Sequence, residues 1–260
     1  MTKLVFSFDD GRKDNLCAAL EILEKNNIPA SFNITTDFVS SLLKENELPC
    51  KNSALSKEEV KQLGSKDIFE IAGHGKRHSN ECKNLIRGVV ELREWFSNKI
   101  INGIASPYSQ AKIEDLISDK NEYFNNGISY IRLGDRITSL CFVKKALRKI
   151  NRKIFHIPFI YAWVHEQSFV DLNDDFILYS IPVLKSDTVS EVISLIKRAI
   201  KKDKNLILMF HSILKKNESE YNSNWSWDWN KFEELIFKVS EMQKHRLLQV
   251  VTTQNLMIGK

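Results

Sequence analysis

The chain is poor in cysteine and has no long hydrophobic run. Its four cysteines (Cys17, Cys50, Cys82 and Cys141) form no Cys-x-x-Cys pair, so we expect unpaired thiols in a reducing compartment, with neither a disulfide framework nor a zinc knuckle. No stretch approaches the roughly 18 consecutive apolar residues that a membrane-spanning helix needs. The N-terminus lacks a basic region followed by an apolar run and a cleavage site. We therefore expect a cytoplasmic protein without a transmembrane segment.

A strong net charge is also absent. The formal net charge is only +5, and the basic residues are spread along the chain, which does not indicate a nucleic-acid partner. We find no internal repeat, low-complexity tract or linker. With 260 residues, of which 43% are hydrophobic and 27% charged, the chain is long enough for a substantial core. We expect one domain that spans residues 1–260.

The first strand ends in the most informative motif. Residues 3–8 are mostly apolar and rich in Val and Phe, which predicts a buried strand, and Asp9, Asp10 and Gly11 follow directly. Two adjacent carboxylates repel each other and lose solvation near a core, and a bound cation would relieve both costs. One carboxylate could then bind a metal while the other acts as a base. The alternative is a solvated turn.

Strands and helices alternate through the rest of the chain, which predicts an α/β fold with a parallel sheet. Apolar runs predict the strands, and helical periodicity with capping boxes predicts the helices. The expected strands are 30–34, 68–72, 100–105, 128–133, 154–158, 176–181, 206–210 and 247–251. The expected helices include 13–26, 56–63, 84–98, 140–150, 188–202 and 231–242.

Two histidines follow the strand expected at residues 68–72. His74 and His78 are four residues apart, which would place both imidazoles on one face of a helical turn. The carboxyl ends of parallel strands meet on one face of a sheet, so Asp10, His74 and His78 should converge there. This arrangement indicates a metal site. Two solvated histidines are the alternative.

Two further strand ends carry residues of interest. Pro107 and Tyr108 follow the strand at 100–105, and the backbone N–H of Tyr108 could bind a ligand. An ordinary turn from strand to helix is the alternative. His211 follows the apolar strand at 206–210. Three tryptophans in a nearby polar segment, Trp225, Trp227 and Trp229, could stack on sugar rings, but we expect at least one of them to pack against the helix at 231–242 instead.

In this order, the motifs resemble those of the polysaccharide deacetylases, the NodB-homology domain of carbohydrate esterase family 4. The family's Thr/Ser-Phe-Asp-Asp-Gly motif corresponds to residues 7–11, and its His-Ser/Thr-x-x-His motif to residues 74–78. Its Arg-x-Pro-Tyr motif corresponds to residues 105–108, and its Leu-x-His motif to residues 209–211. The resemblance implies a distorted (β/α) barrel of the polysaccharide deacetylase type, with fewer strands than the regular eight, in a single domain.

The resemblance also implies a metal-dependent hydrolase that removes an N-acetyl group from an amino sugar in a glycan or glycan precursor. Asp10, His74 and His78 would bind one divalent ion. Zinc is the default for this ligand set, with cobalt, nickel and manganese left open. Asp9 would be the general base and His211 the general acid.

Further residues would contact the substrate or the oxyanion. The backbone N–H of Tyr108, beside Pro107, would stabilise the oxyanion. Arg132 and Trp227 are further candidates at the substrate.

The chain departs from the family pattern at three places. Gly75 replaces a Ser or Thr, and Ala105 replaces the arginine that orients the catalytic aspartate in many members. Arg132 could supply that charge from another strand end, and an ordinary surface arginine is the alternative. The acid-rich fourth motif has no clear match, although Asp171, Asp174 and Asp175 lie in a suitable region. Two alternatives remain: an inactive carbohydrate-binding or scaffold protein of the same fold, and a hydrolase of another amide, such as an N-formyl sugar or a non-sugar substrate.

Overall fold

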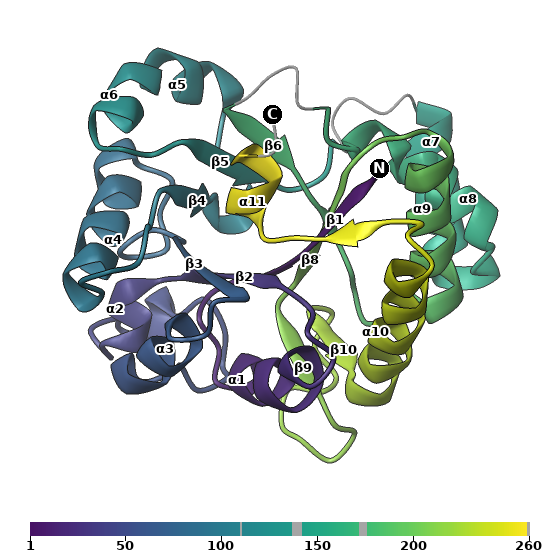
Figure 1. Cartoon of the computed structure of the whole chain (residues 1–260), viewed down its shortest axis with the longest axis horizontal. Coiled ribbons are helices and arrows are strands. Elements are labelled where there is room, and N and C mark those ends of the chain that lie inside the picture. Colours follow the sequence, from purple (N-terminus) through teal and green to yellow (C-terminus); the bar gives the residue numbers. More distant parts are fainter. Residues whose placement is uncertain (110, 137–141, 172–175, 259–260) are drawn as a thin grey trace.

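A parallel sheet, curved into a nearly closed barrel, forms the centre of the molecule and helices surround it (Figure 1). The computed structural model describes residues 1–109, 111–136, 142–171 and 176–258. The sheet strands are β1 (Lys3–Phe8), β2 (Ala30–Ile34), β3 (Phe69–Gly73), β4 (Gly103–Ala105), β5 (Tyr130–Leu133), β6 (Ile177–Tyr179), β7 (Ile181–Pro182), β8 (Leu206–Phe210) and β11 (Gln249–Val250). Strands β9 (Ser212–Leu214) and β10 (Ser226–Asp228) form a separate parallel pair.

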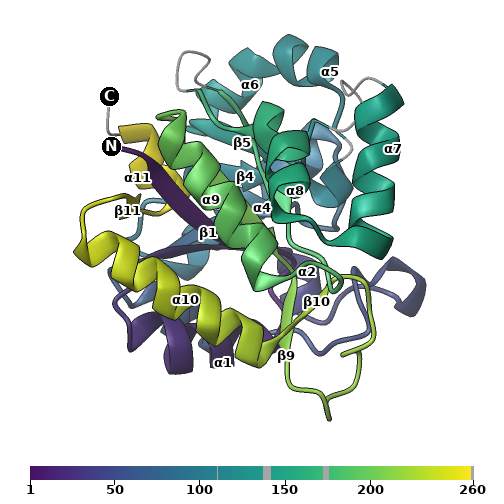
Figure 2. The same ribbon diagram turned by 90° about the vertical axis from the view of Figure 1, so that its right-hand side faces the viewer.

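Helices occupy the connections between these strands and pack against the outside of the barrel (Figures 1 and 2). They are α1 (Asp14–Ala18), α2 (Thr36–Val39), α3 (Lys57–Gly64), α4 (Cys82–Trp95), α5 (Ile113–Ser118), α6 (Lys120–Asn125), α7 (Phe142–Ile150), α8 (Pro158–His165), α9 (Val189–Lys201), α10 (Trp229–Lys244) and α11 (Thr253–Ile258). Segments of π-helix extend α1 over Ala19–Glu24 and α7 over Asn151–Phe155. Among the described residues, no helix combines the length and the apolar character needed to cross a membrane.

A single bent strand closes most of the barrel. The strand order is β6-β5-β4-β3-β2-β1-β8-β7, and every pairing is parallel. Only Ser180 separates β6, which pairs with β5, from β7, which pairs with β8. The prediction of a distorted (β/α) barrel is therefore confirmed.

The inside of the barrel holds polar side chains beside a small apolar cluster that includes Val5 and Ile207, whereas its outer layer is rich in phenylalanine. Successive residues of a strand point to opposite faces, so β1 directs Phe6 and Phe8 outward and leaves Ser7 and Asp9 facing inward. The outward rings pack with Phe32, Phe210 and Phe232 beneath the helices. The apolar helix faces thus bury the outer layer, and the interior is left for a polar site.

Two local structures differ from those predicted from the sequence. Residues 154–158, expected as a strand, form the end of a π-helix and the start of α8. Pro158 suits the first turn of a helix, because its missing N–H is not needed there. His74 and His78 lie on an irregular loop rather than on a helical turn, because Gly75 and His78 have positive φ angles of 78° and 52°.

Candidate functional site

Three side chains from two strand ends form a compact triangle of metal-ligand atoms. Oδ1 of Asp10, which follows β1, lies 3.2 Å from Nε2 of both His74 and His78, which follow β3. The two Nε2 atoms are also 3.2 Å apart. A tetrahedral zinc ion with bonds of about 2.0–2.1 Å requires ligand atoms about 3.3 Å apart. The three atoms are therefore spaced like one face of such a tetrahedron, and all three residues are buried.

The protons in this cluster also favour a cation. Nδ1 of His74 lies 2.9 Å from the carbonyl oxygen of Ala105, which can only accept a hydrogen bond, so this nitrogen carries the proton and Nε2 presents a lone pair. Burial lowers the pKa of His78, which keeps its ring neutral. The three ligand atoms make three contacts with one another, and at most one proton, on Nε2 of His78, is available to form a hydrogen bond among them. A metal ion would satisfy all three, and the hydrogen bond from His74 to a carbonyl is typical of a metal-binding histidine.

Arg12 holds the second oxygen of Asp10. Its Nε and Nη2 atoms lie 2.8 and 2.6 Å from Oδ2, and its Nη1 donates to the hydroxyl of Ser212 at 3.0 Å. Burial would raise the pKa of Asp10, but the adjacent charge of Arg12 opposes it, and this pKa lies well below the usual value. Asp10 has a φ of 78°, so the chain turns sharply and its carboxylate diverges from that of Asp9. Asp10 is thus ionised and offers one free oxygen.

Asp9 lies beside this triangle with different partners. Its Oδ1 accepts hydrogen bonds from the guanidinium of Arg132 on β5 and, at 2.8 Å, from the amide of Asn33 on β2. Burial would raise the pKa of Asp9, but Arg132 and the nearby histidines lower it below the usual value. Asp9 is therefore a buried carboxylate that stays ionised at neutral pH.

Small residues on β4 make room for the side chains of β5. Ala105 and Arg132 are direct neighbours in the register of β4 and β5. One layer below, a Cβ atom on Gly103 would come within 2.0 Å of the ring of Tyr130. The guanidinium of Arg132 therefore reaches Asp9 from the strand adjacent to position 105, where the family pattern has its arginine. Arg132 is 1% exposed and contacts Ser180 and Met209 as well, so it lies beneath the cavity and supports Asp9.

His211 lies at the end of β8 across from the histidine pair. Burial lowers the pKa of His211 to about 4, although the charges of Asp10 and Asp9 act in the opposite direction. Its ring packs against the indole of Trp225 at a centroid distance of 4.6 Å. The amide of Asn15 donates to its backbone carbonyl at 2.7 Å. The imidazole is therefore neutral at pH 7.

A cavity of about 490 Å³ opens over these groups. It is lined by Asp9, Asp10, Arg12, Pro49, His74, His78, Tyr108, Ser109, Gly134, Asp135, Arg148, Pro182, Leu184, Met209, His211 and Trp225. The ring of Tyr108 is 61% exposed and lies 4.3 Å from that of His78. The cavity combines charged groups at its base with aromatic side chains in its wall, a combination that is common in ligand-binding sites.

Three of the residues expected at the substrate do not line the cavity, and they are Arg132, which lies beneath it, Trp227 and Pro107. Trp227 is 1% exposed, packs against Phe210, and donates from its indole N–H to the carbonyl of Asp187, so its assignment to the substrate is wrong. Trp225, which is 44% exposed, takes that place in the cavity wall. Pro107 is buried, and its carbonyl accepts from the side chain of Asn80 at 2.8 Å.

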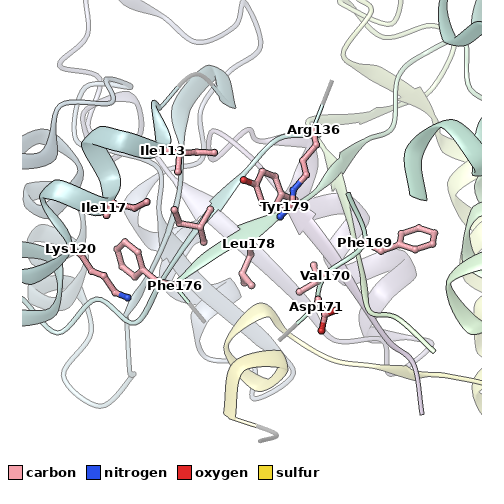
Figure 3. A pocket seen from close by; sticks show the side chains of 11 residues that line it. Ile113, Ile117, Lys120, Arg136, Phe169, Val170, Asp171, Phe176, Leu178 and Tyr179 are labelled. Carbon is pink, nitrogen blue, oxygen red and sulfur yellow. The ribbon is translucent and has the colours of Figure 1, made fainter. Parts of the chain in front are cut away.

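The acid-rich segment that was considered for the fourth motif makes no contribution to the described site. Asp171 is exposed and pairs with Lys204, whereas Asp174 and Asp175 lie outside the described residues. Asp171 instead borders a second cavity, of about 420 Å³, between α5 and β6 (Figure 3). This cavity has Ile113 and Ile117 on one side and Phe169 on the other.

Sequence reasoning missed two residues of the site, Arg12 and Asn33. Both are polar residues at positions where a hydrogen-bond or ion-pair partner is expected. Asn33 interrupts the apolar strand β2, and Arg12 follows the Asp-Asp-Gly turn directly. A polar side chain inside a buried strand must find hydrogen bonds, so Asn33 could have been flagged by its position alone.

Comparisons with known proteins agree with this geometry. The family model described as polysaccharide deacetylase matches residues 2–129. A crystal structure of a presumed polysaccharide deacetylase from Mycobacterium smegmatis is 14% identical, with 98% of this chain and 89% of that one covered and a TM-score of 0.57. A BA3943 mutant, described as a CE4 family pseudoenzyme with restored enzymatic activity, is 13% identical, with 99% and 68% covered and a TM-score of 0.52. BA3943 is from Bacillus anthracis.

At these identities the two structures establish a common fold and no more. The comparison with curated proteins finds no match. The family model covers β1 to β4 and both metal-ligand motifs, and the barrel accounts for the remainder of the chain. The chain therefore belongs to the polysaccharide deacetylase family.

Proposed function

We propose that this protein is a metal-dependent hydrolase that removes an N-acetyl group from an amino sugar in a glycan or glycan precursor. The observation that carries the proposal is the triangle of Asp10, His74 and His78 with an ionised carboxylate, Asp9, beside it. A divalent ion held by the triangle, zinc by default, would polarise the amide carbonyl and lower the pKa of a water molecule. The membership of the family supports the same chemistry.

Asp9 would accept the proton of the attacking water. It has a free oxygen for this purpose, because Arg132 and Asn33 both hydrogen-bond to Oδ1. These two partners hold the carboxylate in a fixed orientation, as a general base requires. The backbone N–H of Tyr108, on the rim of the cavity, would donate to the developing oxyanion.

His211 would return a proton to the departing amine. Because its pKa lies at about 4, the imidazole must first take up a proton during the reaction. The negative charges of Asp9 and Asp10 favour that uptake, and burial opposes it. The rings of Tyr108 and Trp225 would form walls for the sugar ring. The cytoplasmic location and the single domain stay predictions.

The experiment that tests the proposal combines metal analysis with acetate release. We expect about one zinc or similar ion per chain, lost in His74→Ala and retained in Asp9→Asn and in the control His245→Ala, whose histidine is exposed on the surface. Acetate release from N-acetylated oligosaccharides should fall at least a hundredfold in Asp9→Asn.

Three outcomes would contradict parts of the proposal. Full activity of metal-loaded Asp9→Asn would exclude Asp9 as the base. Sugar binding without acetate release by the metal-loaded wild type would identify an inactive member of the family. Turnover of N-formyl or non-sugar amides alone would identify a different substrate.

A further inference from the structure

The segment of α7, the following π-helix and the start of α8 exposes unusually many large apolar side chains. Phe142 is 85% exposed, Ile154 68%, Phe155 61% and Phe159 64%. None of the described residues of α7 is buried. A helix in the connection of a barrel normally buries one apolar face against the strands. We call residues 142–159 the basic amphipathic segment, for the following reasons.

Apolar and basic residues alternate in this segment with a period of four. Apolar residues occur at 142–143, 146–147, 150 and 154–155, and basic pairs at 144–145, 148–149 and 152–153. Residues four apart lie on the same side of an α-helix, and the wider π-helix over 151–155 keeps the later residues aligned with the earlier ones. The segment thus has one apolar stripe and one basic stripe. In the basic stripe the lysines at 145, 149 and 153 are exposed, whereas the side chains of Arg148 and Arg152 are only 13% and 11% exposed.

The basic stripe carries more charge than its neighbours neutralise. Residues 142–159 contain six Lys or Arg residues and no Asp or Glu. Arg148 pairs with Asp135 at 2.9 Å, and Arg152 pairs with Asp187 at 2.7 Å. Lys145, Lys149 and Lys153 are exposed, and the described part of the chain offers them no carboxylate. Like charges four residues apart repel, so an anionic partner would stabilise this helix.

The basic stripe also borders the candidate active site. Arg148 lines the cavity above Asp9 and Asp10, and together with Lys145, Lys149 and Arg152 it lines an adjacent groove of about 300 Å³. Figure 2 shows α7 at the edge of the molecule opposite the N-terminus and α11. Because β1 begins at that terminus, α7 lies on the side of the barrel where the strands end. A partner bound to the segment would therefore lie beside the cavity mouth.

We propose that the basic amphipathic segment docks on the anionic surface of a lipid bilayer and presents the cavity to that surface. Exposed aromatic and branched side chains beside a row of lysines are typical of helices that lie in the interface of a membrane. A soluble polyanion would explain the lysines but not the exposed Phe142, Phe155 and Phe159. A protein partner would need an acidic rim of its own to match the lysines, and the charge pattern of the segment does not require a protein partner. If the proposed function holds, on which this last step rests, docking implies that the acetylated sugar is attached to a membrane lipid.

Sedimentation with lipid vesicles tests the docking without any need for activity. We expect the full chain to bind vesicles of phosphatidylcholine with 30% phosphatidylglycerol and to bind phosphatidylcholine vesicles at least tenfold more weakly. Each lysine near an anionic surface contributes about fivefold to partitioning. The triple variant Lys145→Gln/Lys149→Gln/Lys153→Gln should therefore bind about a hundredfold more weakly.

Two matched controls separate the segment from general surface effects. The triple variant Lys25→Gln/Lys61→Gln/Lys201→Gln removes the same charge from exposed positions elsewhere and should bind like the wild type. The double variant Phe142→Ser/Phe155→Ser should bind at least tenfold more weakly, whereas Phe237→Ser, at a 64% exposed position on α10, should not.

The proposal is overturned if the wild type does not sediment with anionic vesicles at low salt, or if both segment variants bind like the wild type. It is also overturned if sedimentation equilibrium without lipid shows a dimer that Phe142→Ser/Phe155→Ser dissociates, because the apolar stripe would then be an interface between two copies. None of these results depends on metal content or acetate release, so they test the docking independently of the proposed function.

Discussion

Replacing Arg132 with alanine should disable Asp9 without removing any ligand of the metal site. Asp9 is 2% exposed, and Arg132 is the only guanidinium among the described residues that contacts it. Without that cation, Asn33 remains as a neutral donor to the carboxylate. Burial, which now opposes ionisation without compensation, should then raise the pKa of Asp9.

The size of the effect can be worked out from this geometry. An opposite charge in contact with a carboxylate lowers its pKa by about 1–3 units, so the acidic limb of the kcat/KM profile should move up by about 1–3 pH units. At pH 7 Asp9 would remain mostly ionised, and the loss there should come from lost orientation, about tenfold to a hundredfold. A buried charge without its partner should also cost about 3–5 kcal/mol of unfolding free energy.

The assay is acetate release by metal-loaded protein between pH 4 and 8, with metal content measured on each variant. Ala105 and Arg132 are neighbours in register, so the arginine can be moved by one strand. Ala105→Arg alone should be destabilising, because Arg132 already fills the space above Ala105. Ala105→Arg combined with Arg132→Ala should bring the acidic limb back toward that of the wild type. An unchanged acidic limb and unchanged kcat/KM in metal-loaded Arg132→Ala would refute the reasoning.

Three other predictions follow from the same residues. Between pH 7 and pH 5, metal-free wild type should lose about 2 kcal/mol more unfolding free energy than His211→Gln. The reason is that the unfolded state takes up a proton on His211 near pH 6.5, whereas folded His211, with its pKa of about 4, does not. Urea titrations of the two proteins that show the same pH dependence would contradict this. Zinc at a hundredfold excess over its Kd should raise the unfolding free energy by about 2.7 kcal/mol in the wild type and not in His74→Ala, as measured by denaturation with and without the metal. Trp225→Ala should raise KM about tenfold with little loss of stability. Trp227→Ala should instead cost about 3–5 kcal/mol of unfolding free energy, because it empties a core position. Equal effects of the two variants would contradict the placement of the two side chains.

The sequence pattern predicted a parallel α/β sheet and the convergence of Asp10, His74 and His78 for one physical reason, whereas the barrel was implied only by the family resemblance. Apolar runs identify buried strands, and parallel strands in a βαβ arrangement bring their carboxyl ends to one face. Polar residues that directly follow such runs must then lie near one another. This inference needs no knowledge of loop geometry, which explains why it succeeded although the expected helical turn at His74 and His78 was wrong.

Side-chain partners depend on register, which the sequence did not reveal. Arg132 could be suggested as a substitute for the arginine missing at Ala105, but only the pairing of β4 with β5 brings it to Asp9. The tryptophans show the same limit. Trp225 and Trp227 are two residues apart in a polar segment, and β10 pairs with β9 so that Trp227 is buried against Phe210. No local pattern distinguishes the two.

The pairing of each carboxylate with its own guanidinium explains how the site can bind a cation and still keep a base. Asp9 with Arg132 and Asp10 with Arg12 form two buried pairs of zero net charge, and the buried imidazole of His78 is neutral. Both carboxylates are therefore ionised before any ion arrives, so binding need not displace protons from them. Arg12 occupies Oδ2 of Asp10 and leaves only Oδ1 for the ion. That restriction keeps other coordination positions open for water and substrate, as a catalytic site requires. A divalent ion would then leave the site with a net positive charge, which favours the developing oxyanion over the neutral amide.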